Sequence, residues 1–243
     1  MTNKIIEEAV NHLLPDLRAT HGANLAAVVL YGSAATGENV ERGADYNLLI
    51  ALHHITPEDL RLAQAPTREW QRVGHPLPVY FTVEELHGAA DVFPIEFHRM
   101  EKARVVLYGD DPFASLKISD ANLRHQTEYE LRSKLIQLRR LYIPASVSGE
   151  RMSALMRDSL TSYALLFAPV LMLHGVEPPV MKQDLVRATV RLLGLEAEPF
   201  ERILELGAPG AHSLTEAEAN DLFAAYLAQI ERVIQAIDRL ENT

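Results

Sequence analysis

The sequence contains no cysteine, no excess of positive charge and no long apolar run. Without cysteine, the 243-residue chain cannot hold a disulfide scaffold, a thiolate metal site or a cysteine nucleophile. Its 33 acidic and 23 basic residues give a net charge of −10, which argues against sequence-independent binding to DNA or RNA. The most apolar run, residues 164–173, is too short to span a bilayer and contains Pro169. It predicts a buried helix rather than a membrane segment.

The amino-terminal segment does not predict a targeting signal. Residues 1–17 include Glu7 and Glu8 and have no sustained apolar stretch. We therefore expect a cytoplasmic protein. Hydrophobic residues make up 48% of the chain and charged residues 23%, which is ordinary globular composition, and the length allows one large domain or two small ones.

The character of the sequence changes near residue 115. Before it, short apolar runs typical of strands alternate with helical stretches, and after it nearly every segment has a helical period. We predict an α+β chain in which residues 1–115 form a domain with a mixed sheet and residues 116–243 form an all-α helical bundle. The predicted strands cover residues 25–31, 45–52, 78–82, 92–100 and 103–107. The predicted helices cover residues 5–19, 57–73, 122–143, 150–173, 182–193, 199–206 and 215–240.

Two helix starts have recognisable signals. Thr56 is a good N-cap residue and is followed by Pro57, a residue favoured in the first turn of a helix. Ser213 and Glu216 have the spacing of a capping box ahead of the last helix.

The most informative pattern begins at Gly32-Ser33, where a predicted buried strand turns toward a short helix. Glycine permits close backbone approach, and the N–H groups that open a helix bind phosphate oxygens. The hydroxyl of Ser33 could bond a phosphate or cap that helix. The turn therefore predicts a phosphate site.

A second cluster begins the next strand, at Asp45-Tyr46-Asn47. Side chains at i and i+2 share one face of a strand, so Asp45 and Asn47 point the same way and Tyr46 points the other. Neighbouring oxygen ligands suit a hard cation such as Mg²⁺. Glu96, flanked by apolar residues in a predicted strand, is the candidate third ligand, because a charge there is costly unless it binds a cation or a partner. Arg99 and Arg104 are the alternative partners for that carboxylate.

These residues resemble a known signature. A Gly-Ser turn, a short spacer, an Asp-x-Asp-like pair and a later acid are similar to the motif of the nucleotidyltransferase superfamily, which includes DNA polymerase beta and small antibiotic adenylyltransferases. The resemblance covers roughly residues 20–110, and a bacterial subgroup with a C-terminal helical domain looks similar over the whole chain. It implies an N-terminal mixed-sheet nucleotidyltransferase domain. Its implied catalytic metal ligands are Asp45, Asn47 and Glu96, and its implied nucleotide-binding residues are Gly32 and Ser33.

The superfamily pattern has Asp at the position of Asn47. An Asn can bind Mg²⁺ through its amide oxygen, but it adds no negative charge to offset the repulsion in a two-metal site. Two functions therefore stay open. One is Mg²⁺-dependent transfer of a nucleoside monophosphate, from ATP by preference, to a hydroxyl of an antibiotic-like small molecule or a protein. The other is a degenerate nucleotide-binding or regulatory protein, such as an antitoxin-like partner. A homodimer through residues 164–173 is a third, purely structural alternative.

The helix at 122–143 could supply cations for the phosphates. We prefer Lys134, because the leucines around it tie that segment to the core and could aim it at the cleft. The other basic candidates on this helix are Arg132, Arg139 and Arg140. The candidate bases for the acceptor hydroxyl are Glu128 and Glu130.

Overall fold

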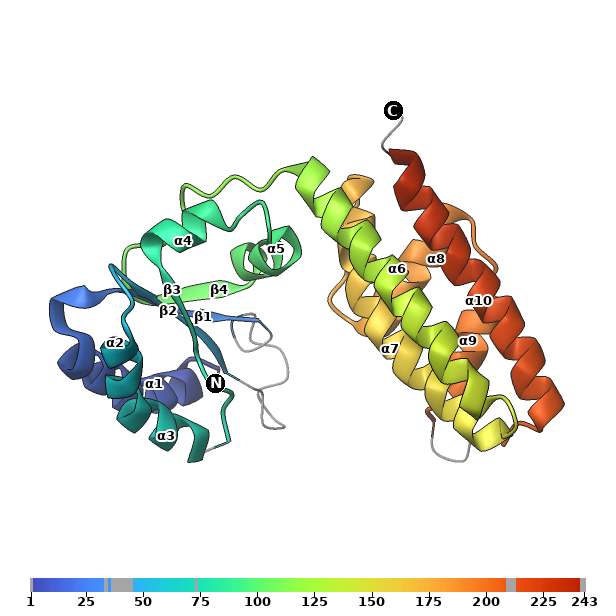
Figure 1. Cartoon of the computed structure of the whole chain (residues 1–243), viewed down its shortest axis with the longest axis horizontal. Helices are drawn as coiled ribbons and strands as arrows, with labels where there is room; N and C mark the ends of the chain where they lie inside the picture. Colours follow the sequence, from blue (N-terminus) through green and yellow to red (C-terminus); the bar gives the residue numbers. More distant parts are fainter. Residues whose placement is uncertain (1, 33–34, 36–45, 73, 209–212, 241–243) are drawn as a thin grey trace. The chain divides into compact units, whose positions relative to one another are not determined.

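The structure, a computed structural model, describes residues 2–32, 35, 46–72, 74–208 and 213–240. The chain divides into two compact units, Met1–Ser119 and Asp120–Thr243 (Figure 1). The division falls between the last strand of the first unit and the first helix of the second. Each unit has its own buried apolar core.

The first unit is built on a mixed sheet, as the sequence predicts, but the sheet has four strands among the described residues and not the five expected. Its strands are β1 (Leu25–Tyr31), β2 (Asn47–Leu52), β3 (Val79–Thr82) and β4 (Arg104–Gly109). The spatial order is β3-β2-β1-β4, in which β1 is antiparallel to both neighbours and β2 is parallel to β3. The apolar run of β1 is buried on both faces, which explains why it reads as continuous rather than alternating.

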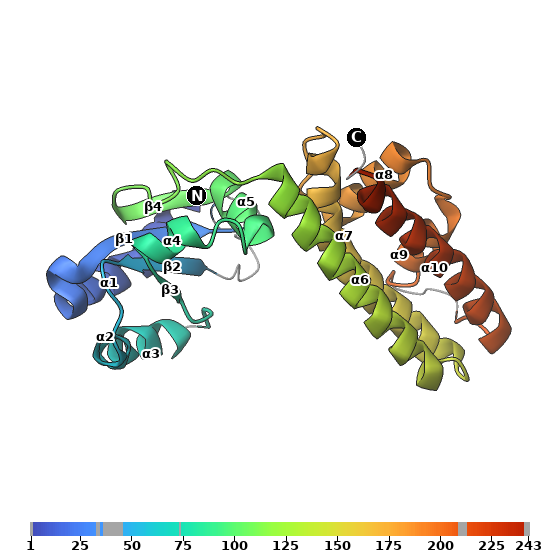
Figure 2. The same ribbon diagram turned by 45° about the horizontal axis from the view of Figure 1, so that its top comes forward.

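Helices cover both faces of this sheet (Figures 1 and 2). One face packs against α1 (Thr2–His21) and α3 (Gln64–Arg72), through residues such as Leu17 and Trp70. The other face packs against α4 (Val83–Gly88) and α5 (Pro94–Lys102), through residues such as Leu86 and Phe97. The 3-10 helix η1 (Gly22–Asn24) leads from α1 into β1.

The predicted helix at 57–73 is divided into α2 (Pro57–Leu62) and α3. Thr56 caps α2 as predicted, and its side chain accepts a hydrogen bond from the Asp59 N–H. At the last helix the capping box lies two residues later than predicted. Thr215 accepts from the Glu218 N–H, and the Glu218 carboxylate accepts from Thr215 in return, so Ser213 is not the cap.

The prediction of a strand at 92–100 is wrong, because this segment forms α5. Its aromatic and branched residues favour a strand, yet the buried positions are Pro94, Ile95, Phe97 and Met100, which have helical spacing. Pro94 also fits the first turn of a helix. Glu96 therefore lies on an exposed helix surface and not inside an apolar strand.

The second unit is all helical, as predicted (Figures 1 and 2). Its central helix, α7, packs against each of the other four and buries the apolar run at 164–173. Within the described residues, no helix is both long enough and apolar enough to cross a membrane. In the described part of this unit the helices are α6 (Asp120–Ala145), α7 (Gly149–Leu173), α8 (Lys182–Leu193), α9 (Glu198–Glu205) and α10 (Glu216–Arg239).

Candidate functional site

The turn after β1 is shaped around Gly32, whose φ of +84° favours glycine. The Gly32 N–H donates to the Ala103 carbonyl at 2.9 Å, and the Gly32 carbonyl accepts from the Ala35 N–H at 2.9 Å. A Cβ atom at this position would lie 3.3 Å from the Asn47 Nδ2 atom. Gly32 therefore lets the turn approach Asn47 closely, while its own N–H is used inside the protein. The predicted phosphate contact of Ser33 lies outside the described residues.

Asn47 begins β2 directly opposite Tyr31 of β1, and Tyr31 is also opposite Arg104 of β4. Directly opposed residues of antiparallel strands share a face, so these three side chains form one row, on the face that α4 and α5 cover. Tyr46 lies on the other face, buried against Trp70. This alternation is the one predicted for the strand. Asp45 lies outside the described residues.

Two arginines, Arg104 in this row and Arg99 near it on α5, differ in their ion-pair partners. Arg104 binds the Asp111 carboxylate through Nη2 at 2.7 Å and Nε at 3.1 Å, and it also contacts the Glu101 carbonyl. Arg99, on the last turn of α5, is exposed and forms no ion pair with any described residue. Burial raises the pKa of Tyr31, and the positive charge of Arg99 opposes that shift. Arg99 therefore lies within electrostatic reach of the Tyr31 hydroxyl.

Glu96 lies one helical turn before Arg99 and is exposed. The expectation of a carboxylate buried in a strand is thus wrong, and the physical reason for assigning Glu96 a cation is lost with it. Within the described ranges, no three acidic or histidine side chains group together to hold a metal. The role of Glu96 as a metal ligand stays a prediction, as does that of Asp45.

Lys134 belongs to the helical unit. It lies on α6, where its Nζ donates to the Ser162 hydroxyl of α7 at 2.9 Å, and it lines a cavity of about 220 Å³ between these helices. It has no carboxylate partner among the described residues. Arg132 and Arg139, by contrast, are ion-paired with carboxylates. Lys134 therefore has a positive charge that no described carboxylate offsets, but its contact with a nucleotide stays a prediction.

Glu128 is a poor candidate for the base. Hydrogen bonds from Arg132 and Arg124 lower the pKa of Glu128, although partial burial opposes them. A carboxylate that already accepts from two guanidinium groups is a weak proton acceptor. Both partners lie four residues away on the same helix, where charge pairs are common, so this spacing is the sequence signal that argues against Glu128 as the base.

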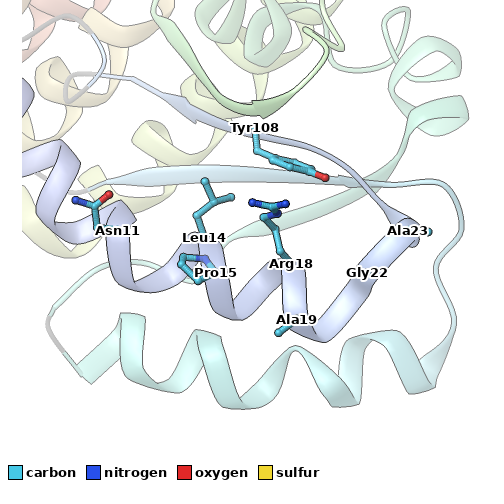
Figure 3. Close-up of a pocket in the computed structure, with 8 residues that line it drawn as sticks. All are labelled: Asn11, Leu14, Pro15, Arg18, Ala19, Gly22, Ala23 and Tyr108. Carbon is cyan, nitrogen blue, oxygen red and sulfur yellow. The ribbon is translucent and has the colours of Figure 1, made fainter.

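A larger cavity, of about 670 Å³, lies on the opposite face of the sheet, between α1 and β4 (Figure 3). Arg18 of α1 lies over the Tyr108 ring, with its guanidinium carbon 5.2 Å from the ring centre. Tyr108 packs with the core cluster of the α1 face, whereas Asn47 belongs to the α5 face. This cavity is therefore separate from the Gly32 turn.

Comparison with known proteins shows the fold. Neither a protein-family model nor a curated protein matches the chain. Among solved structures, the crystal structure of spectinomycin adenyltransferase AAD(9) from Enterococcus faecialis with ATP and spectinomycin is similar, with a TM-score of 0.57 and 13% identity. The match covers 93% of this chain and 98% of that chain. At this identity the likeness shows the fold alone, and it confirms the predicted resemblance at that level: the chain has the α+β fold of a nucleotidyltransferase followed by a helical region.

Proposed function

We propose that this protein is a nucleotidyltransferase that moves a nucleoside monophosphate, from ATP by preference, to a hydroxyl of a small antibiotic-like molecule. The observation that carries the proposal is the close approach of the Gly32 turn to Asn47 at one end of the sheet. These are the parts of the predicted motif that the structure describes, and their close approach supports the proposal. The similar solved structure is an adenyltransferase with ATP and an antibiotic bound, which supports both the nucleotide and the acceptor class.

The reaction needs little covalent chemistry from the protein. The acceptor oxygen forms a bond to the α-phosphorus, the bond from that phosphorus to the pyrophosphate oxygen breaks, and the acceptor proton passes to a base. Catalysis then depends on positioning and on stabilising the phosphate charge. The face carrying Asn47 and Tyr31 would orient the triphosphate, with Arg99 nearby as a cation that has no carboxylate partner among the described residues.

The described residues alone do not complete a resident metal site. Asn47 offers one neutral amide oxygen, and Glu96 is exposed on α5. Mg²⁺ is therefore treated as part of the substrate, the Mg²⁺ complex of the nucleotide. Asp45, Asn47 and Glu96 remain the proposed ligands of that ion.

The test compares three proteins: the natural chain, Asn47→Asp and Asn11→Asp. The third adds the same charge on α1, at an exposed position on the other side of the sheet. Calorimetric titration measures ATP and GTP binding with and without Mg²⁺. Pyrophosphate release is then measured with a panel of aminocyclitol and aminoglycoside acceptors.

We expect ATP binding that requires Mg²⁺ and pyrophosphate release with at least one acceptor. Asn47→Asp should strengthen the Mg²⁺ dependence because it restores a charged ligand, whereas Asn11→Asp should leave it unchanged. Nucleotide binding without turnover in all three proteins would favour the regulatory alternative. If neither ATP nor GTP binds to any of the three proteins, both the nucleotidyltransferase hypothesis and the hypothesis of a nucleotide-binding regulatory protein are wrong.

A further inference from the structure

The α5 helix finishes at the same end of the sheet as the Gly32 turn, where β1 ends and β4 begins. The Ala103 N–H donates to the Arg99 carbonyl at 3.3 Å, and the Ala103 carbonyl accepts from the Gly32 N–H at 2.9 Å. Two successive backbone hydrogen bonds thus connect Arg99 to the turn. Since β4 starts at Arg104, directly opposite Tyr31, the last turn of α5 is held at the row that contains Asn47.

Arg99 and Arg104 are both basic groups at this row, but their charges differ in availability. The Arg104 guanidinium makes a bidentate contact with Asp111 and lies against the Phe113 ring. Arg99 is exposed and has no carboxylate partner among the residues that the structure describes. A guanidinium that is exposed and uncompensated can bind an oxyanion without first breaking an ion pair.

Resting on the proposed function, we propose that Arg99 is a residue of the first unit that binds the polyphosphate part of the nucleotide. Its planar fork can donate two parallel hydrogen bonds to phosphate oxygens, and its fixed charge offsets the negative charge that accumulates as pyrophosphate leaves. The chain as a whole is acidic, so a cation at this turn also lowers the cost of bringing a triphosphate to it.

The chain offers a matched control for this inference. Arg18 is also exposed, also lacks a carboxylate partner among the described residues, and also lies near a tyrosine of the sheet, but on the opposite face (Figure 3). The experiment titrates the natural chain, Arg99→Ala, Arg99→Lys and Arg18→Ala with Mg²⁺–ATP and with AMP. Thermal unfolding of each variant is measured in parallel.

In Arg99→Ala, the affinity for ATP should fall about 10–100-fold, and the affinity for AMP should change far less, because AMP lacks the β- and γ-phosphates. Arg99→Lys should recover part of the loss by restoring charge without the fork. Arg18→Ala should bind ATP like the natural chain.

Three results would overturn the inference while leaving the proposed function in place. They are unchanged ATP affinity in Arg99→Ala, equal losses for ATP and AMP with a lowered melting temperature, and an equal loss in Arg18→Ala. The second would show that Arg99 only stabilises the end of α5, and the third would show a general effect of charge. If the natural chain binds no nucleotide, the inference and the proposed function fail together.

Discussion

The two units position their polar residues by different means. In the first unit, Asn47, Tyr31 and the Gly32 turn are placed by backbone hydrogen bonds at the end of a sheet. In the helical unit, the cavity beside Lys134 is shaped by side chains packed around α7. The first arrangement tolerates little change in the backbone, whereas the second responds mainly to the side chains that fill it. Substitutions that strain the backbone should therefore destabilise the first unit more, whereas substitutions that remove side chains should mainly affect the helical unit.

The largest expected effect is from Gly109→Ala in the first unit. Gly109 ends β4 with a φ of +75°, and a Cβ atom there would lie 1.9 Å from the Ala26 carbonyl oxygen. The strand must shift to accept it, which should cost roughly 3 kcal/mol or more of unfolding free energy. Denaturant unfolding measures the loss, and hydrogen exchange locates it in β1 and β4.

Substitutions at two further glycines serve as a control and as a test of the comparison between the units. Gly88→Ala meets nothing within 4 Å and should change stability by less than about 1 kcal/mol. Gly149→Ala tests the contrast between the units, because a Cβ atom there would lie 2.0 Å from the Leu214 carbonyl oxygen in the helical unit. If Gly149→Ala destabilises its unit as much as Gly109→Ala does, dependence on close backbone approach is common to both units.

The next largest effect concerns ion pairs that join separate segments. In the first unit, the side chains of Arg104 and Asp111 are 19% and 29% exposed, and their atoms approach to 2.7 Å. In the helical unit, Arg139 and Glu231 approach to 2.7 Å as well, but their side chains are 54% and 39% exposed. Arg104→Ala should cost about 2 kcal/mol, whereas Arg139→Ala should cost no more than about 1 kcal/mol.

The acid limb of the pH–stability profile checks the same pair. Partial burial raises the pKa of Asp111, but hydrogen bonds from Arg104 and from the Phe113 N–H outweigh it and lower the pKa overall. The stabilisation is therefore complete above the ordinary value of about 3.9 and is lost as the pH falls below it. The stability difference between the natural chain and Asp111→Asn should shrink over that range. A difference that is constant with pH would mean that the pair contributes no charge interaction.

The helical unit was the easier one to predict. Its elements are long, and their buried residues repeat with a helical period, so the bounds of α8 were predicted as observed. Gly194, in the left-handed conformation, marks its end. Short apolar runs in the first unit predicted β1 correctly, but they misassigned α5, because a short segment with a few aromatic and branched apolar residues fits both periods.

The candidate site was predictable only in part. The order of Gly32 and Asn47 along the chain predicted that they meet, because a turn and the next strand of a sheet are neighbours. The sequence did not predict the position of Arg99 near this turn, because that position depends on the hydrogen bond between Gly32 and Ala103, which are distant in sequence. The sequence gives no reason to treat Arg99 and Arg104 differently, and only the ion pair of Arg104 with Asp111 shows that their charges differ in availability.

The smallest expected effect concerns His21, at the end of α1. Its ring is buried beside the Tyr80 ring, and neither ring nitrogen has a hydrogen-bond partner among the described residues. Burial lowers the pKa of His21, although the Asp59 carboxylate opposes the shift. The folded state therefore disfavours the protonated ring, so stability is complete above the ordinary pKa of about 6.5 and declines as the pH falls below it.

His21→Phe keeps an aromatic ring against Tyr80 and removes the two unpartnered nitrogens. Between pH 7 and 5, the natural chain should lose more stability than this variant, because only the natural ring can take up a proton at a cost. Thermal unfolding of both proteins across this range gives the difference, and hydrogen exchange should place it in the first unit. Parallel profiles would show that the His21 ring is accommodated equally well in both protonation states. In that case buried side chains in the first unit tolerate charge, and its sensitivity resides in the backbone at Gly32 and Gly109.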